Sequence, residues 1–253
     1  LSLSLSQKLP NTLFQKTRQK VRIRGDRAKF PALNTWFDAM ETRDSYLGTK
    51  SDVYTHVHDL PPQLGGCAAV GSTEQRAAAA AIDGSDGSSW HLPLADKPLA
   101  ASLPSLSFEE WPGEDPARDR LAAAARLVSN RTAIARFAAR GAPGGKRGNP
   151  AVSAPLADPF AVADEAALES VDAALRVVAD ALLKGHDGSE EGPRVVEEGA
   201  AAPSQQQKTF SALSAAAAAG YLRDRVGVPR DLPLPAARQL RAHLNWFIDS
   251  VSR

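Results

Sequence analysis

The sequence has little of what stabilises secreted or membrane-embedded proteins. Its 253 residues include a single cysteine, Cys67, which excludes an intramolecular disulfide and favours a reducing, intracellular compartment. No apolar run approaches the roughly 20 residues that a membrane-spanning helix needs, so we expect no membrane span. The formal net charge is only +1, which gives the molecule no overall attraction for nucleic acid and argues against a nucleic-acid partner.

Large core residues are also scarce. Aromatic residues make up 6% of the chain, and much of the 43% apolar content is alanine in the runs 77–81, 122–125 and 215–219. Alanine favours helix but buries little area. The composition therefore predicts a folded, helix-rich protein with few bulky side chains in its core.

Helical periodicity recurs along the chain and predicts an all-α fold, a helical bundle. Pro31 opens the first amphipathic segment, in which Leu33, Trp36, Phe37 and Met40 share one face. Longer apolar stripes predict further helices over 116–140, from Asp164 to a stop at Gly185, over 209–225 and over 235–251. Helices that are individually short and rich in alanine must gain their stability from packing against one another.

Composition divides the chain into four parts. Residues 1–25 hold six basic residues and no acid, which fits either a disordered, transit-like leader or the ragged start of a truncated sequence. Residues 26–67 combine the first helix with an irregular loop, and 68–116 is expected to be a linker whose Trp90, Phe108 and Trp111 dock on a neighbouring surface. Residues 117–253 form a helical extension with a flexible acidic loop over 186–208.

Polar and aromatic side chains crowd the irregular loop. Tyr54, His56, His58 and Cys67 lie there, and we take them together with Trp36 as candidates for binding a substrate or ligand. Imidazole and thiolate could hold Zn²⁺, but the spacing matches no known zinc finger, and structural hydrogen bonding explains the histidines equally well. The Cys67 thiol is either reactive, through a histidine that lowers its pKa, or inert. We assign no metal site and no catalytic residue.

A second candidate is the glycine-rich loop over 141–150, which carries Lys146 and Arg147. Its backbone N–H groups and two cations could cradle a phosphate or another anion. It lacks the Gly-Lys-Ser/Thr sequence of a Walker loop, and an ordinary solvated basic loop explains it as well.

Several phrases resemble one protein family. KFPALNTWFDAMETRDSYL at 29–47 resembles the last helices of the C-terminal domain of glutathione transferases. The phrases TKSDVYTHVHDLPPQLGGC at 49–67, SAPLADPFA at 153–161 and YLRDRVGVPRDLPLPAARQLRAHLNW at 221–246 are similar to glutathione-transferase-like proteins of plants and algae that are commonly predicted to be in the chloroplast. The resemblance covers about a third of the chain and implies the helical domain of that family with a helical extension.

The resemblance implies that the catalytic residues of the family lie elsewhere. Glutathione transferases hold glutathione in an N-terminal thioredoxin-like domain, and no βαβ pattern of that kind precedes Asp26. We therefore expect the C-terminal part of a transferase-like protein, with glutathione as co-substrate of the parent protein. This chain alone is then inactive and has no cofactor. The alternative is a non-catalytic helical subunit or scaffold that makes protein contacts, as a homo-oligomer or in a complex.

Overall fold

The protein is all-α. The computed structural model describes residues 26–49, 51–52, 54–55, 73–85, 90–94, 115–146, 160–188 and 205–252. These residues form helices, turns and irregular segments but no β-strand, and their one antiparallel bridge joins Lys146 to Val162. The predicted fold class is confirmed.

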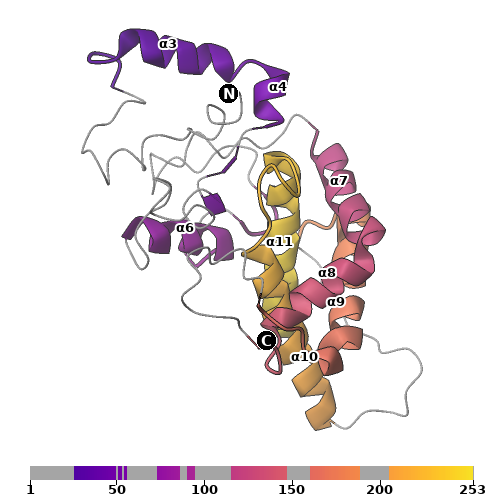
Figure 1. Ribbon diagram of the computed structural model, residues 1–253. Helices are drawn as coiled ribbons and strands as arrows, with labels where there is room; N and C mark the ends of the chain where they lie inside the picture. Colours follow the sequence, from indigo (N-terminus) through magenta and orange to yellow (C-terminus); the bar gives the residue numbers. More distant parts are fainter. Residues whose placement is uncertain are drawn as a thin grey trace.

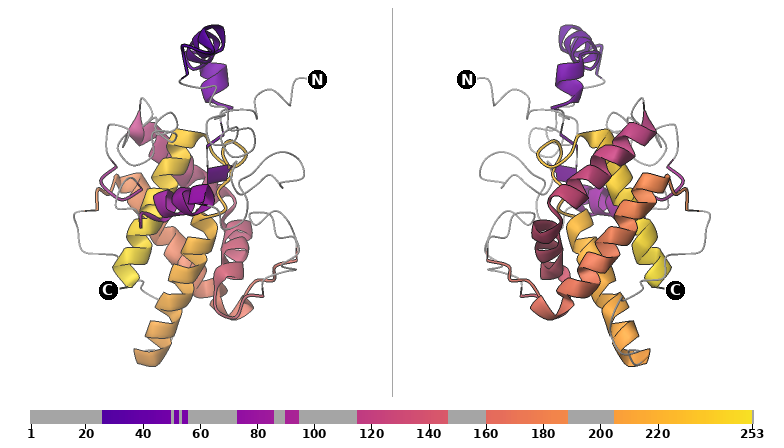
Figure 2. Two further views of the ribbon diagram at one scale, coloured as in Figure 1. Left: turned by 90° about the vertical axis from the view of Figure 1, so that its left-hand side faces the viewer. Right: turned by 90° about the vertical axis from the view of Figure 1, so that its right-hand side faces the viewer.

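The helices form a bundle and a small separate lobe, residues 26–49, which contains α3 and α4 (Figure 1). Helix α11 runs through the bundle beside α7, α9 and α10, and α6 lies across it, while α3 and α4 stand at one end in both views of Figure 2. The helices are α3 (Pro31–Met40), α4 (Asp44–Leu47), α6 (Thr73–Asp83), α7 (Pro116–Ser129), α8 (Arg131–Ala138), α9 (Leu168–Lys184), α10 (Gln205–Arg223) and α11 (Leu234–Val251), with 3-10 turns η2 (Ala139–Gly141) and η3 (Glu165–Ala167).

Local sequence signals set the helix ends. Asp115 caps α7, because its Oδ1 accepts from the N–H groups of Ala117 at 3.1 Å and Arg118 at 3.0 Å, and Pro116 follows at the first helical position. Helix α9 ends where predicted, at Gly185, whose φ of 74° is left-handed. The expected helix over 235–251 is likewise confirmed by α11.

The expected helix over 116–140 is divided into α7 and α8. Asn130 leaves the helical region, with φ −117° and ψ 21°, and serves as the last residue of one helix and the cap of the next. Its carbonyl accepts the N–H of Ile134 at 2.9 Å, and its side-chain amide donates to the carbonyl of Arg126 at 3.3 Å. An asparagine that bonds locally in this way competes with the helical backbone.

Two segments expected to be irregular contain helix. The expected linker over 68–116 holds α6, where Ala78, Ala81 and Ile82 are buried at helical spacing, because the alanine run both favours helix and fits a close-packed surface. Trp90, five residues beyond the turn that follows α6, is buried as predicted; Phe108 and Trp111 lie outside the described residues. Helix α10 begins at Gln205, inside the expected loop over 186–208.

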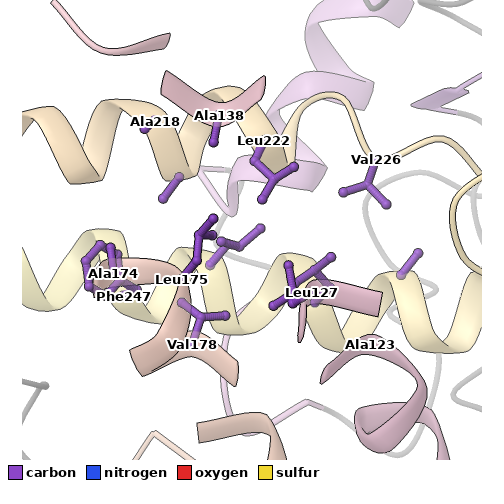
Figure 3. Packing of buried hydrophobic residues seen from close by; sticks show 14 of the residues in the cluster. Ala123, Leu127, Ala138, Ala174, Leu175, Val178, Ala218, Leu222, Val226 and Phe247 are labelled. Carbon is purple, nitrogen blue, oxygen red and sulfur yellow. The ribbon is translucent and has the colours of Figure 1, made fainter. Parts of the chain in front are cut away.

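The bundle core joins many alanines to a few larger side chains (Figure 3). Leu127 of α7, Leu175 and Val178 of α9, Leu222 of α10 and Phe247 of α11 supply the apolar volume. Alanines lie between them and let the helix backbones approach closely; those at most 2% exposed are Ala78, Ala123, Ala124, Ala138, Ala139, Ala174, Ala215, Ala218, Ala236, Ala237 and Ala242. The scarcity of bulky residues is thus met by close packing.

Gly185 and Gly220 provide opposite tests of the helix geometry. Replacing Gly185 by Ala should lower the free energy of unfolding by about 1–2 kcal/mol, because a residue with a Cβ is strained in the left-handed backbone conformation. Its Cβ would also lie 3.0 Å from the Arg120 guanidinium. Gly220→Ala should raise the stability by about 0.5–1 kcal/mol, because Gly220 is inside α10 and its nearest contact would be Ile248 at 3.9 Å. Guanidinium unfolding of both variants measures these changes. Shifts of the same sign would contradict the left-handed helix end at Gly185 or the helical interior position of Gly220.

Candidate functional site

Helix α11 carries an unusual set of buried polar side chains. Arg238, Gln239, Arg241, His243 and Asn245 are each no more than 6% exposed. They are buried because α6, α7, α9 and α10 pack against α11, and because Asp52 and the Trp90 carbonyl contact it as well. Polar groups buried this deeply are stable only when other groups of the protein bind them.

Arg241 is the centre of this set. Its Nη1 donates to the Oδ2 of Asp52, forming a fully buried ion pair, and its Nη2 donates to the carbonyl of Val226 at 2.8 Å. The guanidinium carbon lies 5.3 Å from the centre of the Tyr54 ring and 5.5 Å from that of Trp90. The cation is therefore held by a carboxylate, a carbonyl and two aromatic rings.

The carboxylate of Asp52 also organises its own segment. Its second oxygen, Oδ1, accepts the N–H of Thr55 at 2.8 Å. The Thr55 hydroxyl oxygen in turn accepts the N–H of Val228 at 3.3 Å, in the turn between α10 and α11. Both ends of this short segment are thus bound to the C-terminal part of the bundle.

Asn245 binds further segments to the same helix. Its Nδ2 donates to the carbonyls of Ile82 at 3.0 Å and Trp90 at 2.9 Å, and its Oδ1 accepts from Arg223 at 2.8 Å. Arg223 also pairs with Asp224 at 2.8 Å. Both N–H groups of this amide donate and its oxygen accepts one bond, which fixes the orientation of the side chain.

Trp90 completes the cluster. Its ring is 5% exposed and lies 5.5 Å from the guanidinium carbon of Arg238, the same separation as from Arg241. A buried tryptophan between two guanidinium groups gains both apolar burial and cation–π attraction. We call Asp52, Tyr54, Trp90, Arg238, Arg241 and Asn245 the α11 polar cluster.

His243 faces a different side of α11 and is fully buried. Its Nδ1 donates to the carbonyl of Gln239 at 2.7 Å, so Nε2 carries the lone pair, and Nε2 has no hydrogen-bond partner in the part of the chain that the structure describes. Burial lowers the pKa of His243 to about 4, and the positive charge of Arg120 acts in the same direction. The imidazole is therefore neutral at physiological pH, and its position inside the bundle suits packing rather than proton transfer to a substrate.

The candidates in the irregular loop and on the first helix are not brought together. Tyr54 is buried in the α11 polar cluster, and desolvation raises the pKa of its hydroxyl, with Asp224 adding to the rise. Trp36 is 45% exposed on α3, in the lobe, where its ring contacts that of Phe37. The remaining candidates of this group, His56, His58 and Cys67, lie outside the described residues.

The glycine-rich loop uses its N–H groups within the chain. The Gly144 N–H donates to Oδ2 of Asp164 at 3.0 Å, that of Gly145 to the carbonyl of Ala142 at 2.9 Å, and that of Lys146 to the carbonyl of Val162 at 2.9 Å. The Asp164 carboxylate thus accepts one of the N–H groups of this loop, and binding of an external anion stays a prediction. The side chain of Lys146 is exposed, and Arg147 lies outside the described residues.

Sequence reasoning did not find Asp52, Arg238, Arg241 or Asn245 as members of a site. The local signal available was the row of polar residues interleaved with Leu240 and Leu244. Such a row is typical of a half-exposed helix, and only burial of α11 on all sides turns it into a buried cluster.

Within the described ranges, no three of the His, Cys, Asp and Glu side chains lie close enough to hold a metal ion, and no helix there has the length and apolarity needed to cross a membrane. Comparison of the chain with protein-family models, with curated proteins and with solved structures finds no match.

The buried His243 predicts a pH dependence of stability. Its folded-state pKa of about 4 lies below the ordinary 6.5, so on acidification the unfolded chain binds a proton first. Stability should fall by about 3 kcal/mol in total as the pH is lowered from about 6.5 to 4. Urea unfolding across this range, compared with the non-titrating variant His243→Gln, measures the loss.

A second titratable group, Asp119, makes the control variant His243→Gln necessary. Burial, followed by the charge of Asp115, raises the pKa of Asp119 to about 6, so its contribution to stability is lost as the pH rises through that value. This opposite effect is common to both proteins and cancels in their difference. Identical pH profiles for the two proteins would contradict the role given to His243.

Proposed function

We propose that this chain is the helical C-terminal part of a glutathione-transferase-like protein, with thiol-dependent conjugation as the activity of the parent protein. Glutathione is then the co-substrate of the parent, and the chloroplast its compartment. The 253-residue chain supplies the helical platform and is inactive alone. The proposal rests on the phrases that resemble the family, and on how two of them lie in the fold.

The observation that carries the proposal is that two of these phrases meet in the α11 polar cluster. Asp52 and Tyr54 belong to the phrase at 49–67, whereas Arg241 and Val226 belong to that at 221–246. The buried ion pair and the contact of Arg241 with the Tyr54 ring join them. Two sequence phrases that build one buried cluster are expected to occur together in a protein. This supports the interpretation that both phrases resemble the same family.

The chemistry of the described side chains supports a structural role for this chain, with the thiol-binding residues in another domain. Asp52 and Arg241 bind each other and backbone groups, and Asn245 binds Arg223 and two backbone carbonyls. The Nδ1 of His243 binds its own helix. Groups used in this way position segments and do not meet a substrate. A transferase whose thiol-binding residues lie in another domain needs this kind of platform and no nucleophile within it.

Glutathione binding by the whole protein tests this proposal. The whole protein that contains these residues should be retained on immobilised glutathione and should conjugate glutathione to an aryl halide. The 253-residue chain, purified in parallel as the matched control, should do neither. A whole protein that neither binds glutathione nor conjugates the electrophile would overturn the proposal.

The second candidate function is a helical subunit that binds other proteins, and the exposed face of α3 favours it. Leu33 is 44% and Trp36 45% exposed, three residues apart on a helix that stands away from the bundle (Figure 1). An exposed tryptophan beside a leucine is typical of an interaction surface. Lys29 precedes this face and is exposed as well.

Co-purification from the native cell extract tests this second function. A stoichiometric partner should accompany the tagged chain and be lost from the double variant Leu33→Ser, Trp36→Ser. The control variant Leu183→Ser, at an exposed leucine on α9, should retain it. A clean monomer in all three preparations would rule out the scaffold function.

A further inference from the structure

The exposed side of α3 is apolar, although a helix at the surface of a protein is expected to be polar on that side. Leu33 is 44% and Trp36 45% exposed, and Ala32 and Ala39 are exposed on the same side of the helix. Phe37, on another side, is buried in the lobe. The four exposed residues, which we call the α3 face, form an apolar stripe that is open to solvent.

The polar side chains of α3 leave this face free of charge. Asp38, the one charged residue within the helix, lies on the opposite side and pairs with Arg27 at 2.8 Å. The Thr35 hydroxyl, at the edge of the face, donates to the carbonyl of Pro31 at 3.1 Å. The α3 face can therefore leave water without taking a charged group of the helix with it.

The positive charge of the protein is concentrated around this helix. Of the 30 basic and 29 acidic residues of the chain, nine basic and four acidic ones lie in 1–49. Six of these basic residues are in 1–25, directly before the lobe, and Lys29 and Arg43, which flank α3, are exposed. Residues 1–49 thus have an excess of positive charge and residues 50–253 an excess of negative charge.

We propose that the α3 face binds the surface of a lipid bilayer that contains anionic lipids. An apolar helix side with an exposed tryptophan, close to many basic residues, is typical of a helix that lies in the interfacial region of a bilayer. Leu33 and Trp36 enter this region, and the cations attract the headgroups. Helix α3 stands at one end of the described helices (Figure 2), and the negative remainder of the chain is repelled by the same headgroups. The lobe therefore faces the bilayer and the bundle faces water.

An anionic bilayer is the partner that uses both features of this part of the chain. A nucleic acid would attract the basic residues but offers no apolar surface to Leu33. A protein groove, as in the second candidate function, would bury Leu33 and Trp36 but needs no excess of positive charge spread over 49 residues. The proposal goes beyond the transferase-like function and does not depend on it.

Flotation of the 253-residue chain with lipid vesicles tests the proposal. The probe is a vesicle of about one part phosphatidylglycerol to two parts phosphatidylcholine, compared with a vesicle of phosphatidylcholine alone. The chain should float with the anionic vesicles. It should bind the neutral vesicles at least about tenfold more weakly, because their surface does not attract the basic residues.

Three variants separate the contribution of the α3 face from that of the charge. The double variant Leu33→Ser, Trp36→Ser should bind the anionic vesicles at least about tenfold more weakly, because it loses the apolar area that enters the bilayer. Lys29→Gln should weaken binding about fivefold, the effect of one cation near such a surface. The control Leu183→Ser, at an exposed leucine on α9, should leave binding unchanged. All the substituted side chains are exposed, so the variants should fold as the unchanged chain does.

Several results would overturn the proposal. One is the absence of binding to the anionic vesicles at about 1 mM lipid. Another is equal binding of the double variant and the unchanged chain, because the attraction would then come from charge alone. Loss of a co-purified protein from the double variant, without vesicle binding by the unchanged chain, would assign the α3 face to a protein partner instead. None of these results depends on glutathione, so the proposal and the transferase-like function can fail separately.

Discussion

The buried charge of Arg241 determines how several distant parts of the chain are placed. A charge inside an apolar bundle must be surrounded by groups that replace water, and here Asp52, the Val226 carbonyl, Tyr54 and Trp90 do so. These groups come from three different parts of the chain. The contacts of this one side chain thus bring Asp52 and Tyr54, the segment after α6 and the turn before α11 to the same place.

The alanine-rich packing of the bundle explains why such a constraint is useful. Alanines such as Ala123, Ala174 and Ala218 allow close approach but fit many alternative arrangements of two helices equally well. A buried ion pair and a fully bonded Asn245 are satisfied in only one arrangement. We infer that the apolar core supplies most of the stability and the α11 polar cluster supplies the uniqueness of the fold.

The helices could be predicted because they depend on residues close together in the sequence. The contacts that could not be predicted join residues far apart in the sequence. Pro31, Pro116 and Gly185 mark helix ends through local backbone chemistry, and the apolar stripes of α9 and α11 follow from helical periodicity, so these elements could be predicted. The division of the expected helix at Asn130 depends on one side chain that bonds locally. Helix α6 was not predicted because the glycine- and serine-rich residues on both sides of it favour an irregular segment. Asp52 and Arg241 are 189 residues apart, and no local pattern announces that pairing. Among the candidate site residues, Tyr54 proved to be part of the cluster, but as a packed ring.

A double-mutant cycle on Asp52 and Arg241 measures how strongly the buried cation depends on its carboxylate. The free energies of unfolding of Asp52→Ala, Arg241→Met and the double variant should be measured by denaturant titration under one set of conditions. If the buried cation organises the cluster, Asp52→Ala leaves it without its carboxylate, and the double variant should be less destabilised than the sum of the single variants by at least about 1 kcal/mol. Additive effects of the two substitutions would contradict the claim that Arg241 organises the cluster through Asp52.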